Sequence, residues 1–130
     1  MKKFLAALMA ALGVSLFSCT RHESIHSVIA EEFERAVLSS RAQLLDVRTA
    51  AEYAQGHIAG AVNIDMHAGD FKKRVMEVFD RSRPLLIYCR SGHRSRTAAS
   101  WLASIGFRLI NLKGGIIEWE QAGFRVSPNR

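Results

Sequence analysis

Cys89 is the residue whose type and setting best suit chemistry. It directly follows the most apolar run of the chain, residues 84–88, and the loop after it reads Arg90, Ser91, Gly92, His93, Arg94 and Ser95. A short loop between a strand and a helix turns backbone N–H groups toward its centre, and the helix N-terminus adds partial positive charge. Gly92 allows a positive φ, and Arg90 and Arg94 add full charges. These features favour a thiolate, so we interpret Cys89 as a nucleophile rather than as a small buried hydrophobic residue.

The elements that must position this loop alternate along the chain. Apolar runs predict strands at residues 43–47, 61–64, 84–88 and 107–112. Helical spacing of apolar residues predicts helices at residues 30–38, 49–55, 71–79, 95–105 and 116–122. Thr49 and Glu52 have the spacing of a capping box at the start of the second of these helices. The alternation predicts an α/β domain with a mainly parallel sheet, helices on both faces and ligands outside the carboxyl ends of the strands.

The first 18 residues are interpreted as a signal peptide. Two lysines precede an apolar run, residues 4–17, which is too short to span about 30 Å of hydrocarbon. The run ends in a small residue before Cys19 and resembles the lipobox of bacterial lipoproteins, except at Phe17, where that motif usually has a smaller residue. The resemblance implies cleavage before Cys19, a lipid on its sulfur and an exported chain anchored on the periplasmic side of a membrane. Ordinary secretory cleavage near Ser18 is the alternative. Residues 19–27 are interpreted as a polar spacer and residues 28–127 as one folded domain.

Charge and cysteine content narrow the function further. Eighteen Lys and Arg against twelve Asp and Glu give a net charge of +6, but no long basic run is interleaved with aromatic residues. This argues against nucleic-acid binding and favours small anionic substrates. Cys19 is the only other cysteine, so a lipidated Cys19 leaves Cys89 without a disulfide partner. An unpaired thiol in an oxidising compartment is unfavourable unless it has a function, so this points to a functional role for Cys89. His22 and His26 have no further ligand-type residues around them in metal-site spacing, so no metal is expected.

Three segments resemble rhodanese-type sulfurtransferases: residues 44–64 (LLDVRTAAEYAQGHIAGAVNI), residues 85–95 (LLIYCRSGHRS) and residues 112–119 (LKGGIIEW). The resemblance covers the chain from about residue 27 to residue 126. It implies a rhodanese-like three-layer α/β domain, with a parallel sheet of about five strands flanked by helices.

The same resemblance implies an activity. Cys89 would take sulfane sulfur as a persulfide, with residues 90–95 as the surrounding loop and no cofactor besides this covalent intermediate. The implied partners are a small anionic donor such as thiosulfate, and cyanide, a thiol or a thioredoxin-like protein as acceptor.

Other activities remain open at this level. Tyrosine phosphatases and related-fold phosphatases place five residues between nucleophile and arginine, whereas four separate Cys89 from Arg94, so a phosphatase or arsenate reductase is the weaker alternative. A cysteine hydrolase needs a histidine base, for which His57 and His93 are the candidates; we interpret His57 as a packing residue and His93 as a solvent-facing one. A rhodanese module acting as a sulfur carrier or interaction domain without efficient turnover is the non-enzymatic alternative.

Asp46 and Arg48 lie at the end of the strand predicted at residues 43–47 and, in the family, share a sheet edge with the cysteine loop. We interpret Asp46 and Glu52 as members of ion pairs that hold loops together. Arg48 either adds positive potential at the site or pairs with Glu52 four residues on. Trp101 and Trp119 are expected in the core.

Overall fold

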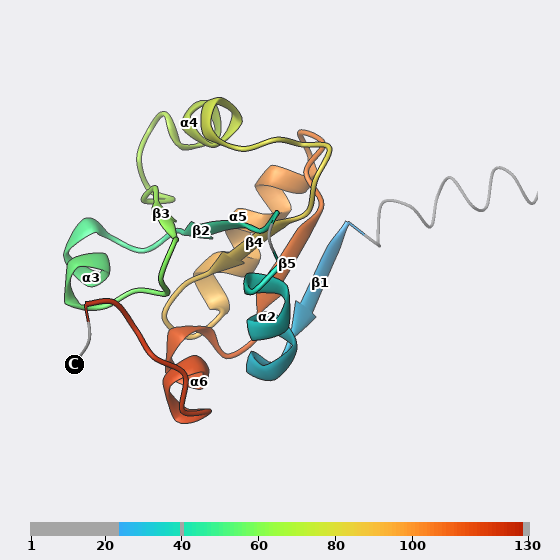
Figure 1. The fold of residues 1–130 in the computed structure, drawn as a ribbon. Helices are drawn as coiled ribbons and strands as arrows, with labels where there is room; N and C mark the ends of the chain where they lie inside the picture. The colour runs from blue at the N-terminus through green and yellow to red at the C-terminus, as the bar shows by residue number, and fades with distance from the viewer. Residues whose placement is uncertain (1–23, 40, 129–130) are drawn as a thin grey trace, which may run out of the picture.

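The computed structural model describes residues 24–39 and 41–128 (Figure 1). The strands are β1 (Ile25–Val28), β2 (Gln43–Asp46), β3 (Val62–Asn63), β4 (Leu85–Tyr88) and β5 (Leu109–Leu112). The helices are α2 (Ala30–Val37), α3 (Ala50–Gln55), α4 (Phe71–Val78), α5 (His93–Ala103) and α6 (Gly115–Gln121).

The five strands form one parallel sheet in the order β1-β5-β4-β2-β3. Every residue of β2 and β4 is buried, which is typical of central strands covered by helices on both faces. Because all strands are parallel, their carboxyl ends meet at one edge of the sheet and their amino ends at the other. The predicted α/β fold with a five-stranded parallel sheet is confirmed.

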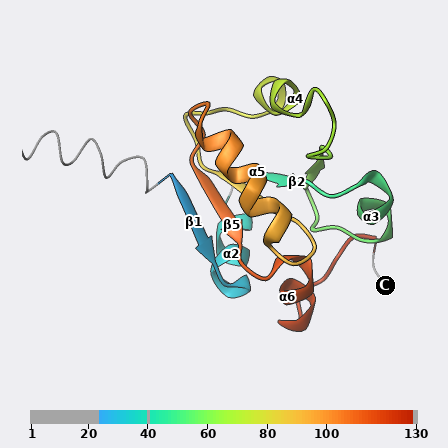
Figure 2. The ribbon, with the colours of Figure 1, turned by 180° about the vertical axis from the view of Figure 1, so that it is seen from behind.

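Helices cover both faces, which gives three layers (Figures 1 and 2). Alternate strand residues such as Leu85 and Ile87 pack with α4 and α5 on one face. Their neighbours Leu86 and Tyr88 pack with α2 and α6 on the other. The period-two alternation of side chains therefore builds two cores, one on each side of β4.

The short helix α3 begins as the sequence predicted. The Thr49 side chain accepts a hydrogen bond from the Glu52 N–H (3.2 Å), and the Glu52 carboxylate accepts one from the Thr49 N–H (3.2 Å). This capping box satisfies N–H groups that have no partner within the helix. It also fixes Glu52 at the carboxyl edge of the sheet.

The interpretation of residues 19–27 as a spacer is wrong for its last three residues. Ile25, His26 and Ser27 belong to β1, which pairs with β5 through contacts such as Ile25 with Leu109. The strand lies at the edge of the sheet, and His26 and Ser27 are exposed, so the segment lacks the apolar run by which the buried strands were identified. The expected signal peptide, Cys19 and the rest of the spacer up to residue 23 lie outside the described residues.

Candidate active site

Cys89 lies at the carboxyl end of the central strand β4. Its side chain is buried, with 0% exposure, and packs in the core that contains Ile87 and Ala98. β4 is held by β5 on one side and β2 on the other, so the backbone that leads to Cys89 is fixed by parallel pairing on both edges. Cys89 is a free cysteine.

The chain turns sharply three residues after the thiol. Gly92 has φ +93°, in the left-handed region, and its N–H donates a hydrogen bond to Cys89 Sγ at 3.1 Å. A Cβ at this glycine would overlap the carbonyl group of Lys113, so both the dihedral angle and the space require glycine. The predicted use of Gly92 to curl the loop around the sulfur agrees with this geometry.

Helix α5 begins earlier than expected. Gly92 is its N-cap, and the helix runs from His93 rather than from Ser95. The left-handed glycine completes the turn at once, so His93 and Arg94 already have helical conformation instead of belonging to the loop. Arg90, Ser91 and His93 are exposed, while Ser95 is buried and donates from its hydroxyl to the Gly92 carbonyl (3.2 Å).

The start of α6 closes the loop from the other side. The Ile116 N–H donates to the Cys89 carbonyl (2.9 Å), and the Ile117 N–H donates to the Arg90 carbonyl (3.2 Å). Because peptide groups are planar and trans, these bonds turn the N–H groups that follow each carbonyl away from α6. Gly115, with φ +66°, permits the approach, since a Cβ there would overlap the Arg90 backbone. No role was predicted for Gly115 from the sequence. The pair of consecutive glycines after a predicted strand was the feature that could have indicated a close backbone approach here.

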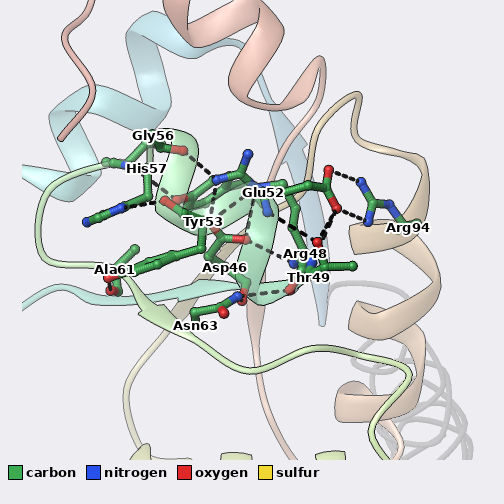
Figure 3. Close-up of polar contacts among 12 residues, drawn as sticks. Asp46, Arg48, Thr49, Glu52, Tyr53, Gly56, His57, Ala61, Asn63 and Arg94 are labelled. Atoms are coloured by element: carbon green, nitrogen blue, oxygen red, sulfur yellow. Dashed lines mark hydrogen bonds and ion pairs between the residues drawn. The ribbon is translucent and has the colours of Figure 1, made fainter. Parts of the chain in front are cut away.

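Arg94 is bound by Glu52 (Figure 3). Its two terminal nitrogens donate to the two carboxylate oxygens, each at 2.8 Å. The hydrogen bonds from Arg94 lower the pKa of Glu52 to about 2, against the opposing effect of burial and with help from Thr49. The same carboxylate raises the pKa of Arg94. The pair ties α3 to the first turn of α5, beside the cysteine loop.

Arg48 pairs with Asp46, so the expected alternative of a pair with Glu52 is wrong. Arg48 Nη2 lies 2.7 Å from Asp46 Oδ2, and the two side chains are 5% and 0% exposed. The Arg48 backbone N–H also donates to Asp46 Oδ1 (2.9 Å), which turns the carboxylate toward its neighbour two residues on. Arg48 further donates to the Gly56 carbonyl (2.8 Å), and its guanidinium lies 5.6 Å from the centre of the Tyr88 ring. Asp46 therefore acts in a buried ion pair, as interpreted (Figure 3).

The remaining residues singled out from the sequence have packing roles or lie at the surface. The His57 ring stacks on Tyr53 (centroids 3.6 Å apart), and its Nδ1 lies 2.9 Å from the Tyr53 carbonyl oxygen, in agreement with a packing role (Figure 3). Trp119 is buried as expected, whereas Trp101 is only partly buried and lies against Phe71.

A small cavity of about 200 Å³ opens beside the loop. Arg48 and Arg90 contribute positive charge to its lining, and Ile116 and Ile117 contribute apolar surface. Glu52 and Glu120 also line it. Of the residues in the cysteine loop, Arg90 is the one that lines this cavity.

Comparison with known proteins connects this geometry to a family. Residues 29–122 match the family model described as rhodanese-like domain. A sulfurtransferase from Allochromatium vinosum is 42% identical over 84 residues, which is 64% of this chain and 76% of that protein. The thiosulfate sulfurtransferase GlpE from Stutzerimonas stutzeri is 33% identical over 93 residues, 70% of this chain and 82% of that protein. The crystal structure of a rhodanese-like domain protein from Staphylococcus aureus superposes with a TM-score of 0.64 at 30% identity, covering 72% of this chain and 90% of that one.

Proposed function

The chain belongs to the rhodanese-like domain family, and on this premise we propose that it is a sulfurtransferase with Cys89 as its nucleophile. In the first half-reaction the Cys89 thiolate attacks the outer sulfur of a donor such as thiosulfate. The S–S bond of the donor breaks, sulfite leaves with the bonding pair, and Cys89 holds a persulfide. In the second, cyanide or a thiolate attacks the terminal sulfur, takes it as thiocyanate or a persulfide, and returns the Cys89 thiolate.

The observation that carries this proposal is the hydrogen bond from the Gly92 N–H to Cys89 Sγ, 3.1 Å long, at the start of α5. A backbone donor fixed before the reaction stabilises negative charge on sulfur without reorganisation. The α6 contacts to the carbonyls of Cys89 and Arg90 support the same assignment, because they hold the loop backbone in place. We assign Arg90, Ser91 and the start of α5, apart from Arg94, to the binding of the anionic donor.

The position of Arg94 favours sulfur transfer over phosphoryl transfer. A phosphatase loop of this kind uses its arginine to bind the equatorial oxygens of the phosphoryl group. Here both terminal nitrogens of Arg94 donate to Glu52 at 2.8 Å. We therefore assign Arg94 to positioning the start of α5, with Asp46 and Arg48 supporting the neighbouring loop.

Intact-mass measurement after incubation with thiosulfate tests the proposal. We expect a gain of one sulfur atom that cyanide removes, with thiocyanate released over many turnovers. The Cys89→Ser variant should gain no sulfur while keeping its fold, and Cys19→Ala should react like the unaltered chain. Loading without turnover would support the sulfur-carrier alternative. Hydrolysis of p-nitrophenyl phosphate without sulfur loading would support the phosphatase.

We also propose that the chain is exported and anchored through a lipidated Cys19. Cys19 lies outside the described residues, so this proposal rests on the sequence. Within residues 24–39 and 41–128, no helix is long and apolar enough to cross a membrane. In a bacterial host the unaltered chain should sediment with membranes and incorporate labelled lipid, and Cys19→Ala should do neither. Membrane association and lipid incorporation by Cys19→Ala would refute the assignment.

A further inference from the structure

The amino edge of the sheet, opposite Cys89, carries a group of arginines. The connections α2–β2, α4–β4 and α5–β5 reach this edge, and Figures 1 and 2 show the last two side by side near the start of β1. The arginines of these three connections are Arg41, Arg81, Arg83 and Arg108, and their one acid is Asp80. We call the four arginines the arginine edge. The last turn of α2 adds Arg35 and Glu34, and that of α4 adds Glu77, so the edge as a whole keeps a positive charge.

Hydrogen bonds between the connections fix three of these side chains at the surface. Arg108 donates to the Ser82 carbonyl (2.9 Å), Arg81 to the Ile105 carbonyl (3.1 Å) and Arg83 to the Arg41 carbonyl (3.0 Å). Each guanidinium has five N–H donors, so these neutral contacts leave its charge and further donors for another acceptor.

Few carboxylates lie beside the arginine edge. Among the described residues, Asp80 is the only carboxylate within 4.0 Å of the arginine edge, 3.5 Å from Arg83. At the carboxyl edge, by contrast, Arg48 and Arg94 each lie within 2.8 Å of a carboxylate oxygen.

A hollow lies between two of the arginines. It has a volume of about 530 Å³, with apolar lining from residues that include Ala36, Leu86 and Ile110, and with Arg41 and Arg83 among its polar lining. A phosphate diester bound by these guanidinium groups could place its adjoining apolar atoms against this lining. A headgroup phosphate of a phospholipid has this combination of charge and apolar neighbours.

The chain enters the domain at the same edge. The Leu109 N–H donates to the Ser24 carbonyl (2.7 Å), which fixes the start of the described chain beside β5. The apolar run at residues 4–17 ends seven residues before Ser24, a separation that can span at most about 25 Å. A membrane that receives either this run or a lipid on Cys19 is therefore within reach of the arginine edge.

We propose that the arginine edge docks on an anionic phospholipid surface. Its guanidinium groups bind headgroup phosphates by charge-assisted hydrogen bonds. Because Cys89 lies at the opposite end of β4, docking turns the cysteine loop away from the membrane, toward soluble donors and acceptors. The inference uses none of the chemistry proposed for Cys89, so either can fail without the other.

Vesicle binding tests the proposal. The full chain, synthesised in a membrane-free cell-free reaction so that it is neither cleaved nor lipidated, is mixed with phosphatidylcholine vesicles with or without phosphatidylglycerol. The measured quantity is the partition constant for vesicles with phosphatidylglycerol divided by the partition constant for vesicles without it. The contribution of the apolar run to insertion cancels in this ratio. We compare the unaltered chain with the triple variant Arg41→Gln, Arg81→Gln and Arg108→Gln. The matched control removes three charges from the exposed side of α4: Lys72→Gln, Lys73→Gln and Arg74→Gln.

We expect the ratio to fall about fivefold for each arginine removed, hence about hundredfold in the triple variant, and to change much less in the α4 control. Salt at 0.5 M should reduce the ratio of the unaltered chain toward that of the triple variant. Arg41→Gln alone, whose side chain makes none of the bonds between connections described above, should give about a fivefold fall even where the triple variant unfolds. An unchanged ratio in Arg41→Gln and the triple variant, or an equal fall in the α4 control, would overturn the proposal. So would equally strong binding of a short DNA duplex, which would indicate general attraction to polyanions.

Discussion

Replacing Glu52 by glutamine removes the negative charge from its pair with Arg94 and leaves an N3 side chain that still suits a capping box. The pKa of Glu52 falls from 4.5 to about 2, and one pKa unit corresponds to about 1.4 kcal/mol, so the shift sets a ceiling of about 3 kcal/mol. The side chains of Arg94 and Glu52 are 29% and 26% exposed, and solvent screening reduces this contribution. We expect Glu52→Gln to lower the free energy of unfolding by about 1–2 kcal/mol at pH 7, a fall in Tm of about 4–9 °C.

The pH dependence of this loss has a defined sign. A carboxyl group whose pKa is lower in the folded state contributes stability above its unfolded pKa and loses it as the pH falls toward the folded value. The stability difference between the unaltered chain and Glu52→Gln should therefore be constant above about pH 5 and shrink between pH 4.5 and about pH 2. Urea unfolding followed by circular dichroism at several pH values measures it. Glu31→Gln, at an exposed position in the first turn of α2, is the control. A difference as large at pH 2.5 as at pH 7 would refute the assignment of the loss to this ion pair.

Three further predictions concern the loop and its supports. Gly92→Ala should cost about 3 kcal/mol or more of stability and abolish sulfur loading, because it adds a backbone clash to a left-handed φ, whereas Gly60→Ala, with φ +87° and open space, should cost about 1 kcal/mol. Arg90→Ala should lower kcat/KM for thiosulfate about tenfold and change the rate with an uncharged organic trisulfide much less, since the exposed guanidinium attracts the anion. Asp46→Asn should destabilise the fold by about 3–5 kcal/mol by leaving Arg48 buried without its carboxylate, and adding Arg48→Met should restore part of the loss.

Each of these three predictions has a result that would contradict it. Thermal unfolding should separate the two glycine variants, and equal losses would remove the argument from the contact at Gly92. Equal losses of rate with both sulfur donors would make Arg90 a structural residue. A cost below 1 kcal/mol for Asp46→Asn would mean that the buried pair contributes little.

The buried strands and the cysteine loop could be predicted because their signals are local. The run at residues 84–88 is continuous and apolar, and Thr49 with Glu52 forms a capping box from neighbours in sequence. β1 was missed for the opposite reason: it lies at the edge of the sheet and exposes His26 and Ser27, so its pairing with β5, more than eighty residues away, leaves no apolar pattern.

The ion pairs show the same limit. Arg48 had a carboxylate at a favourable helical spacing, Glu52, and another two residues before it, Asp46. The pairing was decided by Arg94, which α5 brings to Glu52 from 42 positions along the chain. The start of α5 at His93 likewise depends on the positive φ of Gly92. A glycine in the sequence allows a positive φ but does not require one.

The central position of β4 has a consequence for amide hydrogen exchange. Its four residues are buried and pair with β2 and β5, whereas within the described part of the chain β1 pairs only with β5 and β3 only with β2. Fraying of β1 or β3 therefore leaves the β4 amides protected, and these amides should exchange only through opening of the whole domain. Cys89 follows directly from that strand, so the most slowly exchanging part of the backbone leads into the proposed nucleophile.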